Sequence, residues 1–234
     1  MKILAIECSA KPVSAAVISD GKVIGYAFSD IKLTHSQTLF PIIKSALGAA
    51  RLTFSDIDAI GVATGPGSFT GLRIGISSAK GLAEPNNLKC VGVSTLMATT
   101  YMFRGENAII CPVLDARCGQ VYNALFEVNG STVSRLCDDR TVMIDDLIKE
   151  LKNINDKRII LCCDAAKSVY STAQFKDNLT IAPAPLVLQN AIGVGYCAEA
   201  MLSSGKYSDA AEIMPVYLKL PQAERELKAK LQRG

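Results

Sequence analysis

The residues best placed for chemistry are three carboxylates, because each directly follows an apolar run typical of a buried strand. Glu7 follows ILAI, Asp115 follows IICPVL and Asp164 follows IILCC. Carboxylate oxygens are the ligands that Mg²⁺ prefers, so residues of this kind at strand ends could hold a magnesium ion together with a nucleotide. A carboxylate that caps a turn gives the same pattern, and the sequence leaves both interpretations open.

A glycine-rich stretch, GPGSFTGLRIG at residues 65–75, is the second candidate for chemistry. It fails the P-loop pattern because Lys followed by Ser or Thr is missing at the required spacing. It fails the dinucleotide-binding pattern because the third glycine would fall at Thr70. The nucleophile elbow of serine hydrolases is also absent, since Pro66 stands two residues before Ser68. A tight turn from a strand into a helix is the favoured interpretation, although a helix N-terminus could also hold an anion.

The elements that must position these residues occur in the same order twice. In the first half we predict strands at 2–8, 13–19, 22–28, 59–63 and 89–93, with helices at 36–50, 71–84 and 95–102. In the second half we predict strands at 108–114, 120–128, 131–137, 158–163 and 179–182, with helices at 143–151, after 163 to about 173, and 189–204. Three strands joined by hairpins, followed by alternating helices and strands, predict a mixed sheet flanked by helices. We therefore expect two α/β lobes, residues 1–104 and residues 105–234, the second ending in a charged tail.

Two helices of the first half are candidates for binding a partner. The helix at 71–84 has Gly or Ala at every fourth position, which lines one face with small residues and permits close backbone approach. The helix at 36–50 carries apolar residues widely around its surface, whereas a helix covers its own sheet with one face only. The expected partner interface consists of Leu39, Phe40, Ile43, Gly71, Arg73, Gly75 and Ala79. The alternative is that these residues pack on their own sheet.

Composition indicates a globular protein with a substantial core. Hydrophobic residues make up 49% of the 234 residues, and the net charge of +3 does not indicate a nucleic-acid binder. No apolar run approaches the roughly 20 residues of a membrane span, and the first residues enter a strand without the pattern of a signal peptide. We expect a cytoplasmic protein. The eight cysteines include no C-x-x-C pair and are expected to be reduced, mostly as small core residues.

Several segments together resemble the TsaB (YeaZ) family. The signature is GPGSFTGLRIG at residues 65–75, and the other similar segments are ILAIECS, HSQTLFPII, AKGLA, VGVSTL, DARCGQVY and MPVYLKLPQAEREL. The resemblance covers nearly the whole chain. It implies two ribonuclease-H-like lobes of the actin–hexokinase–Hsp70 superfamily, with mixed sheets flanked by helices.

The resemblance also implies a function. TsaB proteins are non-catalytic subunits in the bacterial synthesis of tRNA threonylcarbamoyladenosine, and they bind and support the threonylcarbamoyltransferase TsaD. The two candidate helices would pair with the same helices of TsaD in a heterodimer, or of a second copy in a homodimer. The ATPase TsaE would join the complex, and tRNA would be bound only through it. This chain would have no cofactor of its own, although the complex could bind ATP or ADP with Mg²⁺.

The sequence departs from its catalytic relatives in ways that matter for chemistry. TsaD holds a metal with two histidines four residues apart on a helix, whereas the single histidine here, His35, is followed four residues later by Leu39. We therefore expect no metal, and a capping or surface role for His35. Relatives often have Asp-Thr-Ser and Gly-Asp-Gly where this chain has Glu7-Cys8-Ser9 and Cys163-Asp164-Ala165.

Two enzymatic alternatives to the scaffold function stay open at this point. One is a nucleotide-dependent phosphotransferase that uses an interlobe cleft lined by Glu7, Ser9, Asp115 and Asp164. The other, which the missing second histidine disfavours, is a metallopeptidase.

Overall fold

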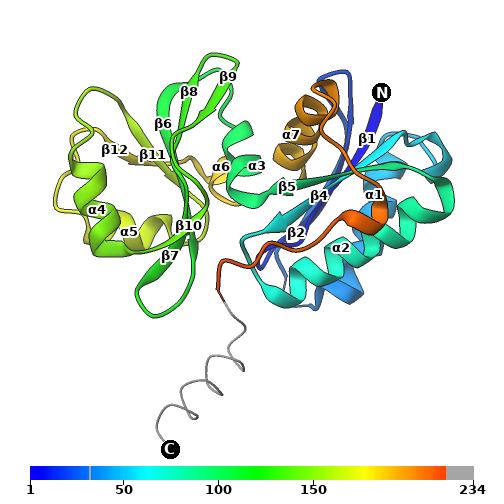
Figure 1. Ribbon diagram of the computed structural model, residues 1–234, viewed down its shortest axis with the longest axis horizontal. Helices are drawn as coiled ribbons and strands as arrows, with labels where there is room; N and C mark the ends of the chain where they lie inside the picture. The colour runs from blue at the N-terminus through cyan, green and yellow to red at the C-terminus, as the bar shows by residue number, and fades with distance from the viewer. Residues whose placement is uncertain (32, 220–234) are drawn as a thin grey trace, which may run out of the picture.

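The computed structural model describes residues 1–31 and 33–219, and it consists of two α/β lobes (Figure 1). The sheet of the first lobe contains β1 (Lys2–Glu7), β2 (Val13–Ser19), β3 (Lys22–Ser29), β4 (Ala59–Gly65) and β5 (Lys89–Ser94), in the order β3-β2-β1-β4-β5. The hairpin from β2 to β3 turns at Asp20-Gly21, where both residues have positive φ, as a two-residue hairpin requires. The strands β4 and β5 run parallel to β1.

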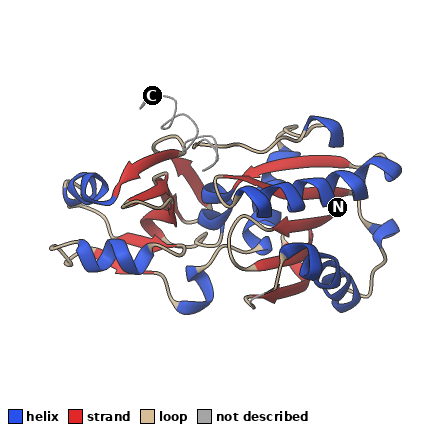
Figure 2. Ribbon diagram, turned by 90° about the horizontal axis from the view of Figure 1, so that it is seen from below, coloured by secondary structure: helices blue, strands red, loops and turns tan. Residues whose placement is uncertain are grey.

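Helices cover both faces of this first sheet, as Figure 2 shows. One face packs on α1 (His35–Ala49) and α2 (Phe69–Ala83), which are followed by the short helices η1 (Phe54–Asp56) and η2 (Glu84–Asn86). The other face packs on α3 (Thr95–Tyr101) and α7 (Ala191–Ser203). Because side chains alternate along a strand, Leu4 and Ile6 join the core under α1 and α2, whereas Ile3 and Ala5 join the core under α7.

The position of α7 differs from the sequence-based division of the chain. The sequence predicts that residues 105–234 form one lobe, but α7 packs on β1, β2, β4 and β5 of the first sheet. A side chain on Gly61 would collide with Ala198, and one on Gly195 would collide with Ile18. These two glycines therefore leave room for the contact. The chain therefore returns to the first lobe after it has built the second.

The second lobe repeats the strand order of the first. Its sheet contains β6 (Asn107–Asp115), β7 (Gln120–Asn123), β8 (Phe126–Asn129), β9 (Thr132–Arg135), β10 (Arg140–Met143), β11 (Ile159–Cys162) and β12 (Leu179–Ile181). The path β10-β7-β6-β11-β12 corresponds to β3-β2-β1-β4-β5, with β8 and β9 added beside β6. The helices are α4 (Ile144–Lys152), α5 (Ala166–Thr172) and α6 (Ala184–Val187).

The strand predicted at 120–128 is interrupted in its middle. The buried Asn123 side chain donates hydrogen bonds to the carbonyls of Pro112, at 3.1 Å, and Ala124, at 3.0 Å, at the break between β7 and β8, which both pair with β6. The third strand beside β7 is consequently β10 and not the segment 131–137. Within the described ranges, none of the helices combines the length and hydrophobicity of a bilayer span.

Residues 213–219 form an extended segment that we call the C-terminal strap. It follows the short helix η3 (Ala210–Glu212) and passes beside α2 toward the second lobe, as the orange trace in Figure 1 shows. The charged tail predicted from the sequence ERELKAKLQR lies outside the described residues.

Candidate functional site

The three candidate carboxylates end up in two different environments. Asp115 and Asp164 lie together at the end of the second sheet, where Asp164 Oδ1 accepts a hydrogen bond from the Asp115 N–H at 2.9 Å. Asp115 Oδ1 in turn accepts from the Arg117 N–H at 2.7 Å. Asp115 therefore caps a turn, which is the alternative that the sequence left open, whereas Asp164 binds the backbone at the end of the neighbouring strand β6. Glu7 forms no hydrogen bond or ion pair with either of them among the described residues.

Glu7 is fully buried at the end of β1. Its Oε1 atom accepts a hydrogen bond from the Ser9 N–H at 2.5 Å, whereas Glu7 Oε2 and Ser9 Oγ have no partner in the described part of the chain. Burial raises the pKa of the Glu7 carboxyl to about 7, because desolvation penalises the charged form.

Three backbone N–H groups around these residues are not free to hold a nucleotide phosphate. A phosphate in such a loop is held by free backbone N–H groups. Here the Cys163 N–H donates to the Val187 carbonyl at 2.5 Å, and the Ala165 N–H donates to the Val113 carbonyl at 3.1 Å. The Ser9 N–H is occupied by Glu7. These three N–H groups are thus already used within the fold, and we derive no step through a bound nucleotide.

The stability of the protein should depend on pH through Glu7. Its folded-state pKa of about 7 exceeds the ordinary 4.5, so the folded state binds this proton more tightly than the unfolded chain does. Stability is consequently lost as pH rises from about 4.5 to about 7, by on the order of 3 kcal/mol. Glu7→Gln removes the titrating group, so its free energy of unfolding in urea, relative to the wild type, should rise between pH 5 and pH 8.

The control for this experiment is Glu84→Gln, because Glu84 is exposed at the end of α2. That variant should track the wild type at both pH values. Equal differences between Glu7→Gln and wild type at pH 5 and pH 8 would show that Glu7 has an ordinary pKa.

Most of the expected partner interface is buried in the first lobe itself. Leu39, Ile43 and Ala79 belong to the core under α1 and α2. Gly71 and Gly75 face Cys8, directly after β1, and a side chain on Gly71 would collide with the Cys8 carbonyl oxygen. The inference that this glycine face is free for docking is therefore wrong, because the sheet of the same lobe covers it.

Two residues of that interface do point outward. Phe40 on α1 is 52% exposed, and Arg73 on α2 is exposed. Sequence reasoning missed two glycines on these helices, Gly48 and Gly81, which are exposed and would have open space around an added side chain. Glycines that no internal packing requires were the signal in the sequence that could have revealed this surface. We call the exposed residues Phe40, Pro41, Lys44, Ser45, Gly48, Thr70, Arg73, Ser77 and Gly81 the outer helix face.

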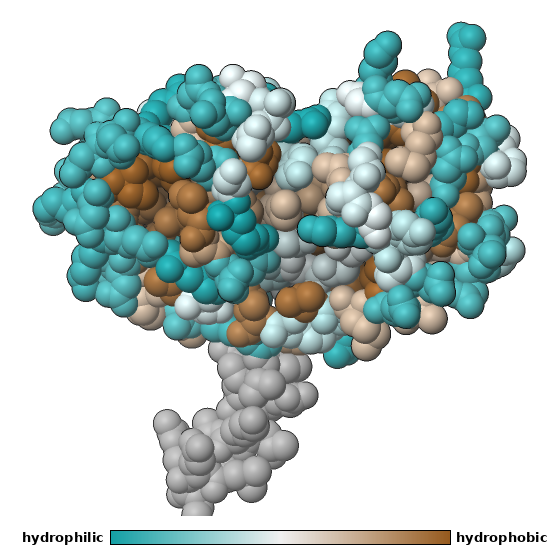
Figure 3. All heavy atoms as spheres, turned by 45° about the horizontal axis from the view of Figure 1, so that its top comes forward, coloured by the Kyte–Doolittle hydropathy of each residue, from teal (hydrophilic) through white to brown (hydrophobic). Residues whose placement is uncertain are grey.

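Exposed hydrophobic residues alone do not identify a binding face in this molecule. Figure 3 shows hydrophobic residues at the surface of both lobes, separated by hydrophilic ones. Leu136 of the second lobe, for example, is 49% exposed. What distinguishes the outer helix face is the combination of an exposed aromatic residue, Phe40, with the exposed glycines Gly48 and Gly81, at which α1 and α2 carry no side chain.

The side chain of His35 forms a hydrogen bond within the fold. Its Nε2 atom lies 2.8 Å from the Ala10 carbonyl oxygen at the start of α1. No group of three His, Cys, Asp or Glu side chains suited to a metal occurs in the residues that the structure describes. All eight cysteines are free thiols, and Cys118 is the exposed one.

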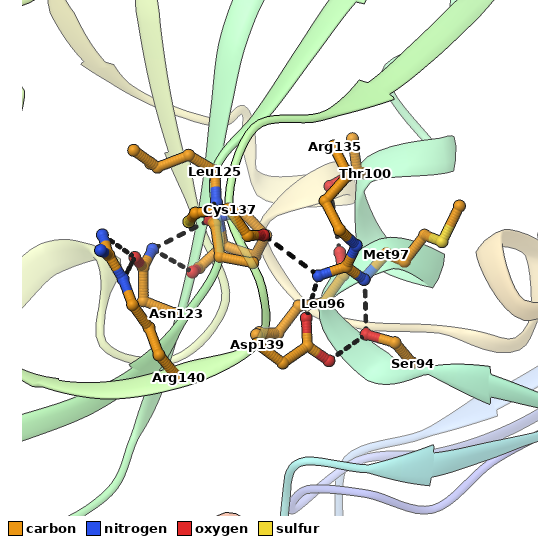
Figure 4. A network of polar contacts seen from close by, with 12 residues as sticks. Ser94, Leu96, Met97, Thr100, Asn123, Leu125, Arg135, Cys137, Asp139 and Arg140 are labelled. Carbon is orange, nitrogen blue, oxygen red and sulfur yellow. Dashed lines mark hydrogen bonds and ion pairs between the residues drawn. The ribbon is translucent and has the colours of Figure 1, made fainter.

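A polar network that sequence reasoning missed joins the two lobes (Figure 4). The Ser94 hydroxyl at the end of β5 donates to Asp139 Oδ2 at 2.5 Å and accepts from the Met97 N–H at 3.2 Å. Asp139 Oδ1 also pairs with Arg135 Nη1 at 2.5 Å. The same serine thus caps α3 and contacts the second lobe. The partners are far apart in sequence, so no local pattern could reveal them.

The repeated strand order and the two lobes define a protein of the actin–hexokinase–Hsp70 superfamily fold. A family model described as TsaD, tRNA N6-adenosine threonylcarbamoyltransferase, matches residues 29–226. The chain is 34% identical to the tRNA threonylcarbamoyladenosine biosynthesis protein TsaB of Bacillus subtilis over 65% of this chain and 66% of that protein. It is 28% identical to TsaB of Escherichia coli over 98% of this chain and the whole of that protein. YeaZ from Pseudomonas aeruginosa has the same fold, with a TM-score of 0.77 and 23% identity over 93% of this chain and 99% of that one.

The chain belongs to the TsaB (YeaZ) family, whose members are named for the biosynthesis of tRNA threonylcarbamoyladenosine. The resemblance predicted from the GPGSFTGLRIG signature is thereby confirmed. The strand topology and the structural match to YeaZ confirm the predicted fold class.

Proposed function

We propose that this chain is a non-catalytic subunit of the tRNA threonylcarbamoyladenosine synthesis complex, and that it binds TsaD through the outer helix face. The observation that carries the proposal is a contrast between two regions. At Glu7, Asp115 and Asp164, each carboxylate accepts a hydrogen bond from a backbone N–H of the chain itself, as a structural role requires. On α1 and α2, an exposed phenylalanine and open glycines leave a surface that a second helix pair can approach.

The remaining parts of the proposal follow from family membership. TsaE would join the complex, tRNA would be bound through the complex only, and the isolated chain would form a homodimer through the same helices. The chain would work in the cytoplasm without a cofactor of its own, and ATP or ADP with Mg²⁺ would be bound by the assembled complex. Exposed single residues such as Phe40 are effective anchors, because burying an aromatic side chain contributes strongly to an interface.

Substitutions on the outer helix face should weaken binding to TsaD from the same organism. Phe40→Asp places a charge at the proposed interface, and Gly81→Trp adds a bulky side chain in open space. We expect each to raise the Kd by roughly tenfold or more and to lower tRNA modification by the reconstituted complex in parallel. The Kd can be measured by calorimetry with purified proteins.

Leu136→Asp is the matched control, because Leu136 is about as exposed as Phe40 but lies on the second lobe. It should leave the Kd unchanged, and all three variants should keep the wild-type melting temperature within a few degrees. Unchanged affinity in both Phe40→Asp and Gly81→Trp would refute this docking face. Tight Mg-ATP binding by the isolated chain would instead favour the phosphotransferase alternative.

A further inference from the structure

The C-terminal strap contacts both lobes within four consecutive residues. Val216 and Tyr217 contact the first lobe, and Leu218 and Lys219 contact the second. A surface segment that merely follows the fold would not need anchors on both sides. The chemistry of each anchor indicates what the strap does.

The anchor on the first lobe is specific. The Tyr217 ring stacks on Phe69, with ring centroids 4.2 Å apart and an interplanar angle of 20°. The Tyr217 hydroxyl accepts a hydrogen bond from Arg73 Nε at 2.9 Å. The Val216 N–H donates to the Thr64 carbonyl at the end of β4, at 2.8 Å. Stacking, a side-chain hydrogen bond and a backbone hydrogen bond therefore fix these two residues in position.

Gly65 allows the strap to lie close to the first lobe. Its φ of +124° lies in a region that side chains rarely adopt, and a Cβ atom there would collide with the Val216 carbonyl oxygen. The end of β4 can accept the strap only because this residue has no side chain.

The anchor on the second lobe lies beside one of the candidate carboxylates. Leu218 packs against the apolar cluster that contains Leu114 and Ala116. Lys219 Nζ donates to the Ala116 carbonyl at 2.7 Å. Ala116 directly follows Asp115, so the strap ends on the loop in which Asp115 Oδ1 accepts a hydrogen bond from the Arg117 N–H.

We propose that the C-terminal strap is a latch that couples the start of α2 on the first lobe to the Asp115 loop on the second. Release of either anchor loosens the contact at the other, because only four residues join them. This inference does not depend on the proposed function. If a partner does bind the outer helix face, Arg73 would connect that event to the second lobe.

Hydrogen exchange measured by mass spectrometry on the full chain tests the latch. Tyr217→Ala removes the stacking and the hydrogen bond on the first lobe, where exchange in residues 64–72 should rise. The latch predicts that exchange in residues 114–120 also rises by roughly threefold or more, although the hydrogen bond and ring contacts of Tyr217 in the described structure are with Phe69 and Arg73. Lys219→Met, which leaves the aromatic pair intact, should raise exchange in residues 64–72 in the same way.

Tyr207→Ala is the control, because Tyr207, like Tyr217, has a basic side chain over its ring, but that side chain is Lys89 at the start of β5, away from both anchors. It should change neither segment. A rise confined to residues 64–72 in Tyr217→Ala and to residues 114–120 in Lys219→Met would mean two independent local contacts and would overturn the latch. If Tyr217→Ala does not unfold cooperatively, Tyr217→Phe and Lys219→Met decide the question in its place.

Discussion

Replacing Gly71 by alanine should destabilise the protein by about 3 kcal/mol. The added methyl group would collide with the carbonyl oxygen of Cys8, a backbone atom that can move only if β1 or α2 shifts. Alanine favours a helix over glycine by about 1 kcal/mol, so the measured loss would be the collision less this gain. Unfolding in urea, followed by circular dichroism, gives the free energy directly.

The matched control is Gly81→Ala in the same helix. Gly81 has no atom within 4 Å of an added Cβ, so only the helix preference remains, and the variant should be more stable by up to about 1 kcal/mol. Opposite signs for the two substitutions would establish that α2 rests directly on β1. A Gly71→Ala protein as stable as the wild type would mean that this packing is wrong. Gly75 lies on the same buried face of α2, so Gly75→Trp would disturb core packing and would not report on partner docking.

A chain cut after residue 104 should not fold cooperatively. It would contain the whole first sheet but would lack α7, which covers the face formed by residues such as Ile3, Ala16 and Ile18. Exposing a contiguous apolar face of this kind removes a large part of the hydrophobic stabilisation and favours aggregation. We expect no sharp thermal transition by calorimetry, and association at micromolar concentration.

The matched variant joins residues 1–104 to residues 188–219 through a flexible Gly/Ser linker, which restores α7 and omits most of the second lobe. It should regain a cooperative transition, because both faces of the first sheet are again covered. If the shorter chain folds cooperatively without α7, then α7 is dispensable for the stability of the first lobe.

Much of the fold could be predicted from local patterns. The Asp20-Gly21 turn, the apolar strands and the amphipathic helices each have a signal that lies within a few residues, so their order was predictable. The sheet on which α7 packs was not predictable. The segment is apolar around most of its surface, so its sequence does not indicate which sheet it covers. Its packing on the first sheet depends on glycines at Gly61 and Gly195, which are distant in sequence.

The candidate site shows the same limit. Glycines and alanines spaced by four along α2 correctly indicate a close approach, but they do not indicate which backbone approaches. The structure assigns that role to Cys8 of the same lobe. Asp115 and Asp164 were predicted at strand ends, whereas the hydrogen bond between them depends on two strands that are adjacent only in the folded sheet.

The return of α7 has a consequence for synthesis on the ribosome. The first sheet is translated by residue 94, yet the helix that completes its cover begins only at residue 191. At bacterial elongation rates this interval lasts on the order of 5–20 s, during which the nascent chain carries an uncovered apolar face. Factors that shield nascent polypeptides should therefore associate with this protein until α7 emerges.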